Sequence, residues 1–453
     1  MINTLHTNEI RSRFSNAMSA MYRQEVPLYS DLIDLVVKVN KQVLDAKPQL
    51  KQQLAAANEL NRLDEERHGA IRIGTGCELN NIRRLFAVMG MYPVGYYDLS
   101  VAGLPVHSTA FRPIDKASLA HSPFRVFTSL LRLELLEDRE LAEEAGRLLA
   151  KRQIITVRAL ELIEIAELSD GLNEAQAKEF ISEALETFRW HSRATVNDHT
   201  YQRLKSAHGL IADVVSFQGP HINHLTPRTL DIDLAQQAMI DQGLVVKTTI
   251  EGPPCRQIPI LLRQTSFKAL AEKITFLGDV DAMHTARFGE IEQRGAALTK
   301  KGRQLYDQLL NSINQDNKEK NPPQYNLDLA KVFDQFPSEI RELHDEKLVF
   351  FKYHADLKAL TTKTNQTVED LIDIGVLILT VQVYEDFLPV SAAGIFQSNL
   401  NSHSQSSYTQ QSNQHLFEEH LGTQVIDEMA LYKEIEVSSL KDALFVIKSA
   451  KPL

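Results

Sequence analysis

Two short segments place a histidine four residues before an arginine, and the chain around both follows one pattern. They are HGAIR at 68–72 and HLTPR at 224–228. The histidines are 156 residues apart (224 minus 68), and so are the arginines (228 minus 72). Each segment is predicted to be a short strand followed by a helix and then by three strands. Two HxxxR matches alone would be a weak sign, but the shared order indicates an internal duplication.

The first repeat is read from alternation and helical spacing. A short strand within 67–76 leads to a helix at 78–90, where apolar residues recur every three or four positions. Gly90 is placed to end this helix. Three extended segments follow, with Gly and Pro between them, at 93–101, 106–114 and 123–136.

The second repeat has the same order of elements. A short strand at 224–229 precedes a helix at 230–244. Three further strands are predicted at 245–253, 259–267 and 288–295.

The segments outside the repeats are mostly helical. A helix is expected at 30–44 with Ser30 as its N-cap, and another begins on Asn173. Amphipathic helices fill the region between the repeats. The polar, low-complexity stretch 397–414 is predicted to be a surface loop and a candidate lid.

Composition narrows the class of protein. A formal net charge of −10 leaves no basic stripe for phosphates, so general nucleic-acid binding is disfavoured. With only two cysteines, Cys77 and Cys255, a disulfide framework and a four-thiolate metal site are excluded. The N-terminus lacks an apolar signal segment, and the longest apolar run, 374–383, is far too short to cross a bilayer. A soluble, cytoplasmic protein is expected.

Polar side chains are predicted on the inner faces of the duplicated strands. Alternation places His68 and Arg72 on one face of their strand, and Glu290 and Glu292 on one face of theirs. Two buried carboxylates are costly unless they are paired or bind a cation. Two histidines and one carboxylate from separate strands suit a divalent metal with open positions, as in non-haem Fe(II) oxygenases.

Spacing alone leaves several assignments open. Glu290 and Glu292 share a face and compete for one ligand position. His221 is a rival to His224, although it lies on the opposite face of a regular strand. A histidine in a strand is more often structural than a ligand, and Arg72 could pair with either glutamate simply to balance charge.

Four motifs together carry a resemblance to a known family. They are HGAIRIGTG, HINHLTPRTLDID, RFGEIEQRG and YEDFLPVSAAGIFQSN. In combination they resemble the bacterial 2-oxoadipate dioxygenase/decarboxylase family, also called 2-hydroxyglutarate synthase, from about residue 60 to 440. The order of units resembles the vicinal oxygen chelate superfamily. The resemblance implies an Fe(II)-dependent enzyme of lysine degradation that converts 2-oxoadipate and O2 into 2-hydroxyglutarate and CO2.

The resemblance also implies roles for individual residues. The metal ligands would be His68, His224 and Glu292. Arg72 matches the family's catalytic clamp on a substrate carboxylate, which suits the bidentate grip of a guanidinium. Val390 and Ser391 match a substrate-contact loop, although Ser391 could equally bond to its own backbone.

The expected fold is α+β, with two pseudo-repeated βαβββ modules forming a cupped mixed sheet around a metal site, surrounded by additional helices. The expected segments are an N-terminal helical part (1–66), the first module (67–137), a helical insertion (138–210), the second module (211–300) and a C-terminal mixed region with the substrate loop (301–453).

The expected partners are a small 2-oxo dicarboxylate and O2, with neither nucleic acid nor membrane. The sequence leaves the oligomeric state open, and a homo-oligomer is allowed. Two other functions also stay open. A metal-dependent lyase or isomerase could use the same ligands, but it would show no strict O2 dependence. A non-catalytic binding protein would use these side chains for packing and would hold no tight metal.

Overall fold

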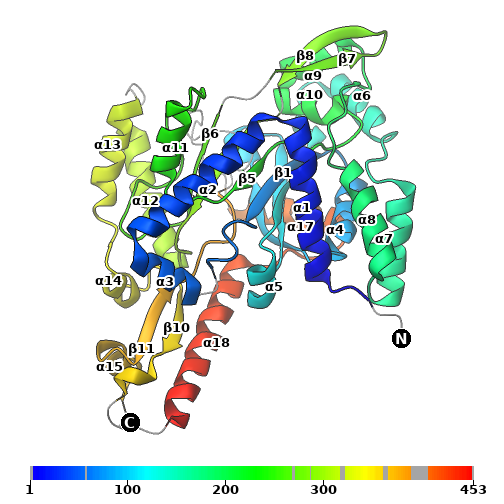
Figure 1. Ribbon diagram of the computed structural model, residues 1–453. Helices are drawn as coiled ribbons and strands as arrows, with labels where there is room; N and C mark the ends of the chain where they lie inside the picture. The colour runs from blue at the N-terminus through cyan, green and yellow to red at the C-terminus, as the bar shows by residue number, and fades with distance from the viewer. Residues whose placement is uncertain are drawn as a thin grey trace. The chain divides into compact units, whose positions relative to one another are not determined.

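The computed structural model describes residues 4–56, 59–267, 271–285, 287–316, 322–360, 366–388 and 407–450. These residues form two compact units. Figure 1 shows the chain coloured from blue at the N-terminus to red at the C-terminus. The first unit comprises Met1–Lys247, Gln264–Glu292 and Phe387–Ile426. The second unit comprises Thr248–Arg263, Gln293–Asp386 and Asp427–Leu453. The five-segment division expected from the sequence stays a prediction.

The first unit is built on a five-stranded mixed sheet. Its strands are β1 (Arg67–Ile73), β2 (Tyr92–Asp98), β3 (Val106–Arg112), β4 (Arg125–Leu131) and β5 (Leu225–Pro227), in the order β2-β3-β4-β1-β5. β1 runs parallel to β4 and antiparallel to β5, and His68 is directly opposite Thr226. The β1–β5 pair therefore joins the two repeats through their first strands.

The second repeat reproduces the strand order of the first. β6 (Leu262–Ser266) and β9 (Glu290–Arg294) form a two-stranded sheet. A parallel bridge joins Arg228, just after β5, to Glu292 of β9, and an antiparallel bridge joins Val246 to Phe267. Across these pairings the order is the segment at Val246, then β6, β9 and β5. This matches the order β2, β3, β4 and β1 in the first repeat. The predicted α+β class, with two modules in a mixed sheet, is confirmed.

One predicted strand is wrong, and one hairpin was not anticipated. Within 245–253, bridges such as the one at Val246 occur instead of a continuous strand. The unanticipated hairpin lies further along the chain, where β7 (Ala271–Phe276) and β8 (Val280–Thr285) pair antiparallel. Gly278 and Asp279 turn this hairpin with φ values of 93° and 60°, a conformation that Gly and Asp tolerate. The Gly-Asp pair between two alternating runs was the sequence signal.

Helices surround the sheet of the first unit (Figure 1). They are α1 (Thr7–Glu25), α2 (Leu28–Ala46), α3 (Pro48–Ala56), α4 (Gly76–Ala87), η1 (Ser100–Ala102), α5 (Lys116–His121), η2 (Leu133–Leu135), α6 (Arg139–Leu149), α7 (Val157–Ser169), α8 (Glu174–Glu186), α9 (Asp198–Ala207), α10 (Gly209–Ser216), α11 (Ile232–Asp241) and α17 (Ser407–Leu421).

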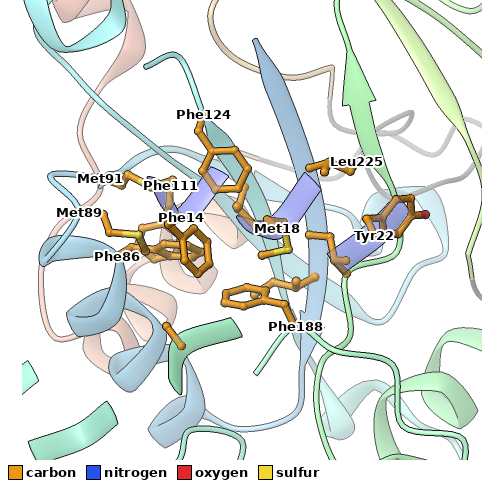
Figure 2. Close-up of a cluster of buried hydrophobic side chains, with 14 of the residues drawn as sticks. Phe14, Met18, Tyr22, Phe86, Met89, Met91, Phe111, Phe124, Phe188 and Leu225 are labelled. Carbon is orange, nitrogen blue, oxygen red and sulfur yellow. The ribbon is translucent and has the colours of Figure 1, made fainter. Parts of the chain in front are cut away.

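One face of the sheet is covered by a large apolar core. Phe14, Met18 and Tyr22 of α1 pack there with Phe111 of β3 and Phe188, as Figure 2 shows. Burying such side chains contributes about 1.5–3 kcal/mol each. A second buried cluster, which includes side chains of α9 and α10, packs with residues of the other sheet face. The polar residues of the site therefore lie on a sheet that is fixed from both sides.

The second unit is smaller and mixed. Its elements are α12 (Lys300–Asp316), α13 (Pro322–Phe333), α14 (Ile340–Asp345), β10 (Phe351–Ala355), η3 (Leu357–Ala359), α15 (Val368–Asp373), β11 (Leu377–Val381) and α18 (Glu428–Ser449). β10 and β11 pair antiparallel, and α18 packs on β10. None of the helices in the described ranges combines the length and apolar character that crossing a bilayer requires.

Helix boundaries were predicted with mixed success. The Asn173 side chain caps α8 as expected, by accepting from the backbone N–H of Gln176. Ser30 is not a cap, because α2 already begins at Leu28. The loop predicted at 397–414 is wrong for 407–414, which belong to α17, and its earlier part lies outside the described residues.

Candidate metal centre

Two histidines from the paired first strands of the repeats meet in the first unit. His68 lies on β1 and His224 immediately precedes β5, and both are buried. Their ring centroids are 5.3 Å apart, with the rings nearly perpendicular. Gly69 allows this approach, because a Cβ there would lie 2.4 Å from Ile222 Cδ1 and 3.2 Å from the carbonyl oxygen of His224. The glycine of HGAIR thus leaves room for the side chain of Ile222 and the backbone of His224.

Glu290, the first residue of β9, completes a group of three donors. Its Oε2 lies 3.2 Å from His68 Nε2 and 3.6 Å from His224 Nε2. One ligand atom from each of the three residues lies within 4.8 Å of the others. Thr226 Oγ1 and Gln264 Nε2 donate hydrogen bonds to the same carboxylate oxygen at 2.9 and 3.0 Å. Outer hydrogen bonds of this kind orient carboxylates that bind metals.

The ring nitrogens of the two histidines are candidate metal ligands. All four nitrogens of His68 and His224 are buried and lack a hydrogen bond of acceptable geometry to any described residue. A bound cation would satisfy one nitrogen of each ring, and for His68 this would be Nε2, because Nδ1 lies 2.8 Å from Glu292 Oε2. A divalent metal therefore fits the residues present.

Burial and charge set the protonation of the three donors. Burial lowers the pKa of His224 to about 4, so its imidazole is neutral at neutral pH. Burial also disfavours the charged form of His68, but Glu292 and Glu290 outweigh it and raise that pKa. For Glu290, the two histidines outweigh burial and lower the pKa of the carboxyl group. Glu290 and His224 are thus in the forms that bind metals, whereas the two carboxylates favour a proton on His68 that a metal would displace.

Glu292 lies on the other edge of the His68 ring. Its Oε2 is 2.8 Å from His68 Nδ1, and its Oε1 is 3.7 Å from Arg125 Nη1. It belongs to a balanced network of three glutamates and three arginines, all buried. The members are Glu59, Arg62, Glu66, Arg125, Arg228 and Glu292. Pairing of this kind offsets the desolvation of each charge.

Arg72 lies on the same face of β1 as His68 and is held by Asp213 of α10. Its Nη1 donates to Asp213 Oδ2 at 2.8 Å. The Arg72 charge contributes to the low pKa of His224, so the cation acts on the three-donor group electrostatically. Arg72 therefore pairs with Asp213 rather than serving only to balance a glutamate of β9.

Aromatic rings pack beside the three donors. The ring of Phe387 lies edge-on to His68 with centroids 5.0 Å apart, and Phe127 lies 5.2 Å from Phe387. Phe288 lies 4.9 Å from His224. These rings limit the access of water to the histidines, which strengthens electrostatic interactions there.

The structure brings most of the predicted residues together. His68, His224 and Arg72 come from the predicted strands, whereas His221 contacts Asp213 instead of the three-donor group. Of the two glutamates, Glu290 is the one grouped with both histidines. Val390 and Ser391 lie outside the described residues, so their roles stay predictions.

Sequence reasoning missed residues that support the site. Asp213 is the one acidic residue in the apolar helix GLIADVVS, and a carboxylate in such a run was a usable signal. Gln264 and Thr226 gave no such signal, because polar residues are common on strands. Their part depends on the pairing of distant segments.

Comparisons with known proteins show the family of this chain. A sequence model of the 2-oxoadipate dioxygenase/decarboxylase family matches residues 14–399. The chain belongs to this family. It is 54% identical over 444 residues to the 2-oxoadipate dioxygenase/decarboxylase of Pseudomonas putida, which covers 96% of each chain. The Escherichia coli relative of the same name is 53% identical over 445 residues, covering 97% of this chain and 98% of its own.

Solved structures of the family have the same fold. The hydroxyglutarate synthase from Pseudomonas putida in complex with 2-oxoadipate superposes with a TM-score of 0.93 at 51% identity, covering 99% of this chain and all of the other. A second structure of that enzyme has a TM-score of 0.90 at 49% identity, with the same coverage. The family predicted from the four motifs is confirmed.

Proposed function

We propose that this chain is an Fe(II)-dependent dioxygenase/decarboxylase that converts 2-oxoadipate and O2 into 2-hydroxyglutarate and CO2. The observation that carries the proposal is the buried group His68, His224 and Glu290 with Arg72 on the same strand face. The named activity of the family members and the 2-oxoadipate in the related structure support the substrate. One substrate carbon leaves as CO2, and both atoms of O2 are accounted for in the two products.

The donor set favours iron among the divalent metals. Two imidazoles and one carboxylate with open positions are typical of non-haem Fe(II) oxygenases. We propose Glu290 as the carboxylate ligand because of its distances to both histidines. The family resemblance assigned Glu292 instead, and that assignment stays a prediction. Bound Fe(II) would supply coordination for the 2-oxo acid and activation of O2.

The spacing along β1 suits a dicarboxylate. In an extended strand, His68 and Arg72 are separated by four residues, or about 13 Å between their Cα atoms. A substrate coordinated near His68 through its 2-oxo acid end can present its second carboxylate to the Arg72 guanidinium. A planar guanidinium binds a carboxylate through two parallel hydrogen bonds. Arg72 would therefore bind and orient the substrate, while Phe387 and Phe127 keep water from the reacting end.

Oxygen consumption by protein purified without oxygen and reloaded with Fe(II) tests this function. The substrates are 2-oxo acids of four to seven carbons, and the products are measured as CO2 and 2-hydroxy acid. We expect 2-oxoadipate to give equal amounts of O2 consumed, CO2 released and 2-hydroxyglutarate formed. Iron-loaded protein that consumes no O2 with any of these acids would contradict the proposal and favour a lyase or isomerase.

A further inference from the structure

The buried carboxylate of Asp213 accepts a hydrogen bond from Arg72, the arginine that would bind the substrate. We propose that Asp213 is a positioning residue, which holds the Arg72 guanidinium in the orientation that receives the second carboxylate of the substrate. The inference rests on the proposed function, because it assigns Arg72 to that carboxylate.

Asp213 lies where a carboxylate is costly unless it has a purpose. It is on α10, between buried apolar residues of the same helix, and only 7% of it is exposed. An uncompensated charge in such surroundings costs several kcal/mol. Burial by itself would raise the pKa of Asp213, but His221, His284 and Arg72 reverse this and lower it. Asp213 is therefore ionised at any pH at which the protein functions.

Each oxygen of Asp213 has a separate set of partners. Oδ2 accepts from Arg72 Nη1 at 2.8 Å. Oδ1 lies 3.0 Å from His284 Nε2 and 3.4 Å from His221 Nε2. The Tyr201 hydroxyl lies 2.7 Å from the other ring nitrogen of His284. The simplest assignment is that Tyr201 donates to His284 Nδ1 and His284 Nε2–H donates to Asp213.

Packing holds this row of groups in place. The indole of Trp190 stacks on His284 with an interplanar angle of 9° and lies edge-on to His221 at 4.7 Å. Asn223, with its amide turned to suit its neighbours, accepts from Arg72 Nη1 at 2.9 Å and donates to the carbonyl oxygen of Ala70 at 3.1 Å. Two acceptors thus meet the same nitrogen of Arg72, and both residues are buried.

An arginine needs such partners in order to act as an orienting group. Its long side chain loses rotational freedom when it binds a ligand, and partners that fix it beforehand reduce that cost. Without Asp213, we expect Arg72 to sample several orientations. The substrate carboxylate would then have to order Arg72 as it binds, and this cost weakens substrate binding rather than the reaction that follows.

The test is a double-mutant cycle on substrate binding. Asp213→Asn, Arg72→Ala and the double variant are compared with the wild type in KM and kcat for 2-oxoadipate, in iron content and in the Kd of 2-oxoadipate measured by calorimetry without oxygen. Asp98→Asn is the matched control, since Asp98 is an equally buried partner of an arginine, Arg132, and lies on the outer strand β2.

We expect Asp213→Asn to raise the KM and Kd about tenfold or more, while kcat stays within about twofold and iron content is unchanged. In the Arg72→Ala background, Asp213→Asn should add no further effect, because its role passes through Arg72. Additive effects in the double variant, or a Kd equal to that of Asp98→Asn, would overturn the inference. Wild-type protein that binds no 2-oxoadipate would instead refute the proposed substrate, and the inference with it.

Discussion

At the scale of single residues, the two glutamates of FGEIEQRG have different neighbours although they share one face of β9. Glu290 approaches the Nε2 atoms of both histidines, whereas Glu292 lies against Nδ1 of His68 and near Arg125. Alternation could predict that both point inward, but it could not choose between them. The choice depends on the position of His224, which comes from a segment more than sixty residues earlier.

Neutral replacements of the two glutamates separate their roles. We expect Glu290→Gln to weaken Fe(II) binding by more than about 100-fold, because a ligand is lost. Glu292→Gln should weaken it by about 10- to 100-fold, as is usual for groups that orient a ligand. Fe(II) titration under anaerobic conditions measures both. The reverse ranking would make Glu292 the ligand, as the family resemblance implied.

His221 provides a test of the buried electrostatics. Burial outweighs Asp213 and lowers the pKa of His221 to about 4, whereas an unfolded histidine has a pKa of about 6.5. Between these values the unfolded state binds the extra proton, so acidification destabilises the fold by up to about 3 kcal/mol. We expect the melting temperature of the wild type to fall more steeply from pH 6.5 to 4 than that of His221→Gln. Parallel curves would show that His221 titrates normally.

At the scale of elements, the sequence predicted what periodicity and glycine placement determine. The strands and helices of the first repeat and the helix of the second agree with the structure. The residues 245–253 form only isolated bridges, such as that of Val246 with Phe267, because strand formation depends more on tertiary context than on local alternation. The contact of Asp213 with Arg72 could not be predicted from local sequence either, because it joins positions 141 residues apart.

Gly69 tests the contact between β1 and the His224 segment. Gly69→Ala would place a methyl group 2.4 Å from Ile222 Cδ1 and 3.2 Å from the carbonyl oxygen of His224, so the Ile222 side chain must move and the backbone at His224 must give slightly. We expect a loss of about 1–3 kcal/mol in stability together with weaker Fe(II) binding. Gly209→Ala is the control, because its Cβ would meet no atom within 4 Å. Equal iron affinity in the two variants would mean that the close approach does not position His224.

At the scale of the molecule, the histidines, the glutamates of β9, Arg72 and Asp213 all belong to the first compact unit. A ligand that binds only the folded state stabilises it, by about 2.7 kcal/mol at 100 times its Kd. Fe(II) added without oxygen should therefore raise the melting temperature of the wild type but not of His224→Ala. An equal rise in both would place the iron elsewhere.

Anomalous diffraction at the iron absorption edge would locate the metal and its ligands. Crystals would be grown without oxygen in the presence of Fe(II) and 2-oxoadipate. We expect one strong iron peak within bonding distance of His68, His224 and Glu290, with the second carboxylate of the substrate on Arg72. An iron peak away from the two histidines, or a substrate carboxylate that does not reach Arg72, would contradict this expectation.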